Sequence, residues 1–154
     1  FGAKVNNIQI DGISFIEYHS FEAFNEGVRL KQCIEYQESL TGIKVKRVGA
    51  DSIYANNANR TMCTEKGITT CFTRKGPRPK EEAECLKTAR KIIGNLRATV
   101  MEGSFGNQKQ HYSLGRIKAR NMFSERLLLF FGIHTANAAI LAAREMARRV
   151  KKAA

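Results

Sequence analysis

The chain has 154 residues, enough for one domain with its own hydrophobic core. It carries 26 Lys and Arg against 14 Asp and Glu, a net charge of +12, which favours a polyanionic partner such as nucleic acid over a merely solvated basic surface. The apolar run "LLLFFGI" is too short to span a bilayer, and no signal peptide is recognisable, so we expect no membrane segment.

The cysteine and histidine pattern argues against a structural metal site. Four cysteines occur without any C-x-x-C pair, at Cys33, Cys63, Cys71 and Cys85, and the three histidines are scattered. Neither a zinc site nor a disulfide framework has this spacing. We therefore expect reduced thiols in a cytoplasmic protein.

The N-terminal region predicts a β-hairpin over residues 4–18. Two runs rich in β-formers, residues 4–10 and 13–18, flank Asp11 and Gly12. An Asp-Gly pair between such runs favours a type I′ turn, because both central residues of that turn need positive φ.

A helix is predicted over about residues 21–39. Ser20 is a favourable N-cap and Glu22 suits the first turn, while Gly42 provides the stop. Gly27 weakens this helix in its interior.

The middle of the chain predicts a strand, a helix and a second strand. Residues 43–51 alternate apolar and basic side chains and end in Asp51, and residues 68–73 form another β-rich run. Between them, residues 56–67 predict a helix stopped by Gly67. This order is typical of an α/β fold with at least one parallel crossover. A basic loop follows over residues 74–80, where two prolines exclude regular pairing.

A long helix is predicted over about residues 81–110, and it contains a Glu-x6-Lys pattern. Glu102 and Lys109 are seven residues apart, about two full turns, so both side chains point to the same face. They are too far apart for a direct i,i+4 pair, so each is expected to have its own partner.

The chain closes with a basic connection, residues 111–120, and a helix over about residues 123–150. One apolar stripe follows this helix: Leu129, Ile133, Ala136, Ile140, Ala143, Ala147 and Val150. Its end is strongly basic, and within it we expect His134 and Asn137 to form structural hydrogen bonds.

Several long segments, in this order, resemble the transposases of bacterial insertion sequences. They are "FGAKV", "IDGISFIEYHSFEAFNEG", "GADSIYANNANRTMCTEKGI", "KGPRPK" and "MEGSFGNQKQHYSLGRIKARN". The resemblance implies a DDE catalytic domain with an RNase H-like fold, which uses two Asp and one Glu. It covers essentially the whole chain.

The resemblance implies that Asp51 is the second catalytic Asp and Glu102 the catalytic Glu, both holding metal, with Lys109 on DNA phosphate. Each residue also has a plainer interpretation. Asp51 could cap the helix after its strand, Glu102 could be an ordinary exposed carboxylate, and Lys109 could lie on a solvated face. Gly103 and Gly106 would let DNA or a strand approach the helix.

The chain departs from the family pattern at two places. The family's first catalytic Asp lies on a strand before the hairpin, and this chain starts at the hairpin, so that Asp has no counterpart here. Asp11 is not a substitute, because it lies in a turn. The family often places an Arg four residues before the Glu, where this chain has Ala98, and Arg97 lies five before it.

Three further cations, Arg116, Lys118 and Arg120, are candidates for phosphate contact beside the metal site, or are simply a basic loop. Together with Arg97 and Lys109 they form the predicted DNA-binding set.

The resemblance implies metal-dependent DNA cleavage and strand transfer with Mg²⁺ or Mn²⁺, by a homo-oligomer on transposon ends and target DNA. On this interpretation the chain is the C-terminal part of an RNase H-like catalytic domain, lacks the first strand, and is inactive alone. Two alternatives stay open: a non-catalytic nucleic-acid-binding remnant, and another RNase H-like nuclease.

Overall fold

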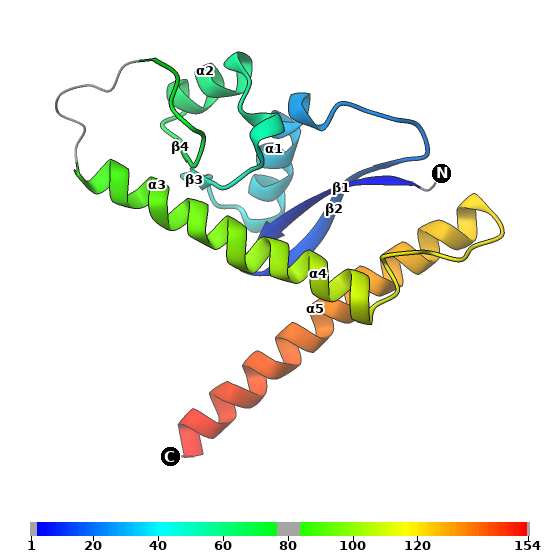
Figure 1. Cartoon of the computed structure of the whole chain (residues 1–154). Coiled ribbons are helices and arrows are strands. Elements are labelled where there is room, and N and C mark those ends of the chain that lie inside the picture. The colour runs from blue at the N-terminus through cyan, green and yellow to red at the C-terminus, as the bar shows by residue number, and fades with distance from the viewer. Residues whose placement is uncertain (1–2, 77–83, 154) are drawn as a thin grey trace. The chain divides into compact units, whose positions relative to one another are not determined.

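The computed structural model describes residues 3–76 and 84–153, and the chain divides into two compact units. Unit 1 combines residues 1–22 with residues 102–154, and unit 2 is residues 23–101. Figure 1 shows the order of the elements along the chain.

Unit 1 begins with the predicted hairpin. Strand β1 (Lys4–Ile10) pairs antiparallel with β2 (Ile13–Ser20), and one irregularity falls between Asn6 and Asn7. The turn residues Asp11 and Gly12 have φ of 48° and 76°, the positive values that a type I′ turn needs, so the hairpin prediction is confirmed.

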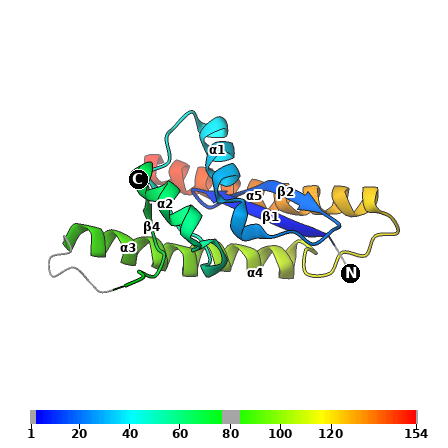
Figure 2. The same ribbon diagram turned by 90° about the horizontal axis from the view of Figure 1, so that it is seen from above.

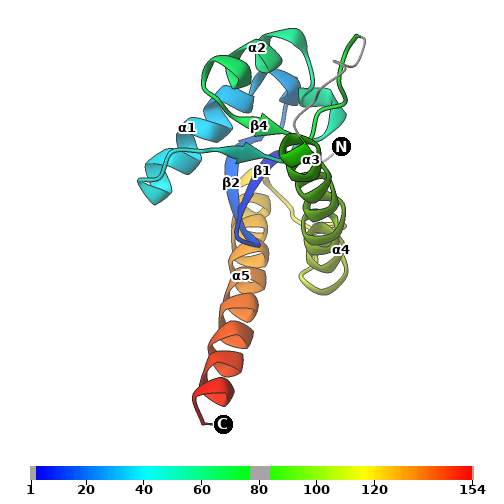
Figure 3. The ribbon, with the colours of Figure 1, turned by 90° about the vertical axis from the view of Figure 1, so that its left-hand side faces the viewer.

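Two helices complete unit 1. They are α4 (Glu102–His111) and α5 (Met122–Ala153), and α5 confirms the predicted C-terminal helix. The first part of the apolar stripe on α5 is buried, at Leu129, Ile133 and Ala136, and α5 packs against β2. Figure 3 shows the C-terminal part of α5 extending beyond the hairpin, and residues 141–152 are all exposed.

By length and composition, α5 could cross a membrane. An 18-residue window has a mean hydropathy of 1.5, and 22% of it is buried. The helix itself was predicted, but its membrane-like composition was not, because the expectation rested on the uninterrupted apolar run alone. A single helix of this kind is weak support for a membrane span, since core helices of soluble proteins have the same composition.

Unit 2 contains the predicted parallel crossover. Strand β3 (Arg47–Val48) pairs parallel with β4 (Thr69–Thr70) through the short helix η2 (Ser52–Tyr54) and α2 (Asn57–Glu65). In Figure 2, β4 lies between α2 and α3 (Glu84–Leu96), in agreement with their contacts.

Both strands of unit 2 are shorter than predicted, because each has one pairing partner in the described part of the chain. The core beside them comprises Leu30, Ile34, Val45, Cys63, Ile68 and Phe72.

Helix α1 (Leu30–Thr41) starts later than predicted and is preceded by η1 (Glu26–Val28). Ser20 Oγ accepts the N–H of the nearby Glu22, which lies outside any helix, and Asn25 caps η1 instead. A Cβ at Gly27 would lie 2.5 Å from the Ile53 carbonyl oxygen, so the backbone here packs closely against η2. Gly42, with φ of 67°, ends α1 as predicted.

The long helix predicted over residues 81–110 is present from Glu84 to His111, but a π-helical turn, η3 (Arg97–Met101), separates α3 from α4. The Thr99 hydroxyl donates to the Asn95 carbonyl at 2.8 Å. That carbonyl is the acceptor the Thr99 N–H would use in an α-helix, so the side chain competes with the regular ladder. Residues 81–83, and residues 77–80 of the predicted loop, lie outside the described part.

The mixture of helices and small sheets confirms an α/β chain at the coarse level. The RNase H-like arrangement remains a prediction.

Candidate active site

Asp51 lies just beyond the C-terminal end of the parallel strand β3. Its Oδ1 accepts the Ser52 N–H at 2.5 Å and caps η2, whereas α2 is capped by Asn56. The capping role considered for Asp51 is therefore present, on a helix of three residues. Its side chain is 66% exposed and accessible to a ligand.

Arg97 is a charged neighbour of Asp51. Its Nη1 lies 4.0 Å from Asp51 Oδ1, and its own side chain is 28% exposed. Gly49 allows this approach, because a Cβ there would lie 3.2 Å from Ile93 Cγ2 and 3.5 Å from Arg97 Cβ. A larger residue at position 49 would push α3 away from the strand that leads to Asp51.

Glu102 is the first residue of α4, directly after the π-turn, and Lys109 lies near the end of the same helix. Both are exposed. Because α4 is a regular α-helix, the two side chains share one face, as the sequence predicted. The structure places Glu102 and Lys109 in unit 1, and Asp51 and Arg97 in unit 2.

The opposite side of α4 is held by a buried polar cluster that sequence reasoning missed. Gln108 Nε2 donates to Ser14 Oγ at 2.9 Å and to Ser104 Oγ at 3.3 Å. Asn137 accepts the Ser14 N–H at 2.9 Å and donates to the Ser14 carbonyl at 2.7 Å. We call Ser14, Gln108 and Asn137 the Ser14 cluster.

The expected structural role of Asn137 is thus confirmed. His134 instead packs its ring against Phe130, with 4.1 Å between centroids. No local pattern identified Gln108, because its partners lie far away along the chain.

The connection between α4 and α5 presents its three cations outward. Arg116, Lys118 and Arg120 are exposed, whereas the intervening Ile117 and Ala119 are half-buried. This alternation is the burial pattern of an extended segment lying on the surface of unit 1.

The start of this connection is fixed on α5. A Cβ at Gly132 would lie 2.6 Å from Leu114 Cδ2 and 3.0 Å from the Tyr112 carbonyl oxygen, so glycine is needed for this close approach.

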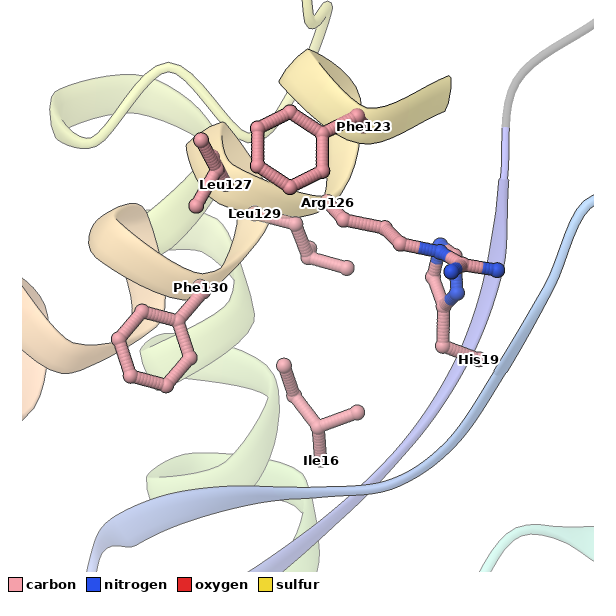
Figure 4. A pocket seen from close by; sticks show the side chains of 7 residues that line it. All are labelled: Ile16, His19, Phe123, Arg126, Leu127, Leu129 and Phe130. Carbon is pink, nitrogen blue, oxygen red and sulfur yellow. The ribbon is translucent and has the colours of Figure 1, made fainter.

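A largely apolar cavity of about 400 Å³ lies between β2 and the first turns of α5 (Figure 4). It is lined by Ile16, His19, Phe123, Arg126, Leu127, Leu129 and Phe130. Burial lowers the pKa of His19, the Arg126 charge lowers it further, and Glu125 opposes the shift. The cavity includes none of the predicted site residues.

Comparison with known proteins decides the family. The chain matches the Transposase DDE domain family over residues 48–128, more than half of its length. The chain belongs to this transposase family. No curated protein and no solved structure matches it.

Membership of the transposase family connects the chain with DNA transposition and with DNA as partner. The matched range contains both predicted acids, Asp51 and Glu102, and all five predicted DNA-binding cations.

The two acids suit the metals expected of a DDE transposase in donor chemistry, since Mg²⁺ and Mn²⁺ prefer carboxylate oxygen and Mg²⁺ keeps several waters. Within residues 3–76 and 84–153, no group of three or more His, Cys, Asp or Glu side chains gathers. The described residues therefore do not supply a third acid that would complete a metal site with Asp51 or Glu102.

Proposed function

We propose that this chain is the C-terminal part of a catalytic domain that cleaves DNA at transposon ends and joins the freed ends to target DNA. The observation that carries the proposal is the family match over residues 48–128, which contains an exposed Asp beyond a parallel strand and an exposed Glu on a later helix. Ligands of α/β proteins commonly bind beyond the carboxyl ends of parallel strands.

Asp51 and Glu102 would hold the divalent cation of the reaction. When bound, Mg²⁺ or Mn²⁺ stabilises the charge that develops on the phosphate and on the attacking and leaving oxygens. The π-turn before Glu102 supports a functional role for this segment, because such turns are frequent at functional sites.

In the first reaction a water oxygen bonds to phosphorus, the P–O3′ bond breaks and the 3′ oxygen leaves with a proton. In the second, that 3′ hydroxyl oxygen attacks a target phosphate, and a target 3′ oxygen leaves. The contribution of the protein to both is chiefly positioning and neutralisation of charge.

The DNA backbone would be held by Lys109, Arg116, Lys118, Arg120 and Arg97. The first four belong to one continuous stretch of unit 1 and are exposed. Arg97 lies beside Asp51 and would exchange that carboxylate for a phosphate when DNA binds.

The completed domain would contain a further strand carrying the first Asp. Each sheet in the described part has two strands, and isolated pairs are marginal in water. A further strand pairing with an open edge of one of these sheets would satisfy its unpaired backbone groups. We place the working protein in the cytoplasm, as an oligomer on DNA.

The test is metal-dependent nicking of a labelled duplex taken from the DNA flanking its own gene. Four proteins are compared: the chain, a longer chain including residues encoded upstream of Phe1, and that longer chain with Asp51→Asn or Glu102→Gln. We expect nicking and strand transfer only by the unsubstituted longer protein. Glu65→Gln, at an exposed helix end, is the matched control.

Full activity in either substituted protein removes that residue from the site. Robust nicking by the chain alone contradicts the need for a third acid. Nicking without strand transfer indicates another RNase H-like nuclease, and DNA binding without nicking indicates a non-catalytic remnant.

A further inference from the structure

Near the C-terminal end of α5, residues 144–152 form a helical segment with two chemically different faces. At about 100° per residue, five cations fall within an arc of about 160°. They are Arg144, Arg148, Arg149, Lys151 and Lys152. Met146, Ala147 and Val150 lie on the other side of the helix.

The charge on this face is only partly neutralised. Arg144 Nη1 lies 3.0 Å from Asp11 Oδ2, and Glu145 is shared between Arg148 at 3.8 Å and Arg149 at 3.0 Å. Lys151 and Lys152 are both exposed to solvent. Five cations against two carboxylates leave a local charge of +3.

The face is also open. The side chains of Arg148 and Arg149 are 68% and 78% exposed, and Arg144 is 44% exposed even while bound to the hairpin turn. The Asp11–Arg144 pair ties the start of this segment to the turn of β1 and β2, so the segment is presented at a defined place in unit 1.

We propose that residues 144–152 of α5 form a second DNA-binding surface, which lies along the phosphate backbone of a duplex. The proposal rests on DNA as the partner in the proposed function, and adds a contact outside the family-matched range. Arginine and lysine side chains on an exposed helix are suited to phosphate oxygens, which they bind without reading sequence.

Charge decides between DNA and the other possible occupants of this face. If the same face of a second copy of the chain bound here, two faces of charge +3 would meet and repel each other. A membrane-surface helix needs a row of large apolar anchors, often aromatic, opposite its cations. Residues 144–152 offer only Met146 and Val150 there, with Ala147 between them and no aromatic side chain.

The test measures duplex binding by fluorescence anisotropy as a function of salt, using the whole chain and a 20-base-pair duplex of arbitrary sequence. The variant Arg148→Gln, Lys151→Gln, Lys152→Gln keeps Arg144 and Arg149 in their ion pairs. Each lost phosphate contact lowers the slope of log K against log[salt] by about 0.9, so we expect a decrease of up to about 2.7.

The matched control removes three exposed lysines of unit 2, with Lys31→Gln, Lys66→Gln and Lys87→Gln. Its net charge equals that of the test variant, so a purely global charge effect would lower both slopes equally and overturn the proposal. Helix content by circular dichroism should match wild type for both proteins, because all six positions are exposed.

An unchanged slope in the α5 variant overturns this surface and leaves the proposed function intact. If the unsubstituted chain binds no duplex at any salt concentration, the DNA partner itself fails, and the proposed function with it. Loss of binding to phosphatidylserine vesicles, with DNA binding unchanged, would assign the face to membranes instead.

Discussion

Ser14 is completely buried, and its polar atoms are satisfied by side chains 94 and 123 residues further along the chain. Gln108 and Asn137 are themselves 4% and 6% exposed. The Ser14 cluster therefore connects β2, α4 and α5 through hydrogen bonds shielded from water. Since Glu102 and Lys109 lie on the other side of α4, the cluster determines which face of α4 remains exposed.

Asn137→Ala should destabilise unit 1 by about 2–4 kcal/mol, because it leaves the Ser14 N–H and carbonyl buried without partners. Amide exchange at Ser14 and urea unfolding of the hairpin measure the loss. Asn107→Ala, at an exposed position of α4, should change stability by less than about 0.5 kcal/mol. Equal effects of the two substitutions would contradict the role assigned to Asn137.

His19 predicts a pH dependence with a defined sign. The pKa of His19 in the folded chain is below the ordinary value of 6.5. At a pH between the folded and the ordinary pKa, the unfolded chain therefore binds more protons than the folded chain. Stability should therefore be complete above about pH 6.5 and fall as pH decreases through the folded pKa. Thermal unfolding of His19→Gln should lose this part of the dependence, while His134→Gln should retain it. Retention by both would exclude His19 as the source.

The assignment of Asp51 and Glu102 as catalytic acids stays a prediction, which rests on resemblance over several segments and, for Asp51, also on its place at the end of a strand. The Ser14 cluster and the Arg97–Asp51 pair could not be predicted. Both depend on contacts between residues far apart along the chain, and helix and strand periodicity gives no information about such contacts.

The glycines of α4 and α5 differ in their surroundings: Gly132 of α5 is closely packed, and Gly106 of α4 is not. Gly132 lies against Leu114 and the Tyr112 carbonyl, whereas an added Cβ at Gly106 would meet nothing within 4 Å. Gly106 therefore only weakens its helix, unless an external partner approaches there.

Gly132→Ala should cost about 1–3 kcal/mol through overpacking, and Gly106→Ala should stabilise α4 by about 0.5–1 kcal/mol. Chemical denaturation of the two variants measures both effects. Weaker duplex binding by the stabilised Gly106→Ala protein would show that DNA approaches this part of α4. Stabilisation by Gly132→Ala would contradict the close packing of Leu114.

The elements with local signals were predicted well, and the others were not. The Asp-Gly turn, Gly42 and the α5 stripe specify their own conformations. Strands β3 and β4 were predicted too long, because the length of a strand depends on its neighbours. The start of α1 was wrong because Gly27 packs against Ile53, a contact that local sequence does not reveal.

For the whole molecule, the charge of +12 predicts duplex binding with little sequence preference and a steep salt dependence. Replacing Arg116, Lys118 and Arg120 by Gln should lower the slope of log K against log[salt] by up to about 2.7. Anisotropy titrations at several salt concentrations and with two unrelated duplexes measure this. Affinity that barely changes with salt would count against an electrostatic interface.

The interruption of unit 1 by unit 2 has a consequence for protein synthesis. The backbone of Ser14 cannot meet Asn137 until 123 further residues have been made, about 6–25 s at ordinary elongation rates. Unit 2 is one continuous segment of the chain and can fold during that interval. The hairpin has been synthesised by then, but α4 and α5, which pack with it in unit 1, have not. We expect a chain ended at Asn121 to protect the amides of α1 and α2 from exchange and to leave those of β1 and β2 unprotected. Protection of the hairpin in that shortened chain would show that it forms before α5 emerges from the ribosome.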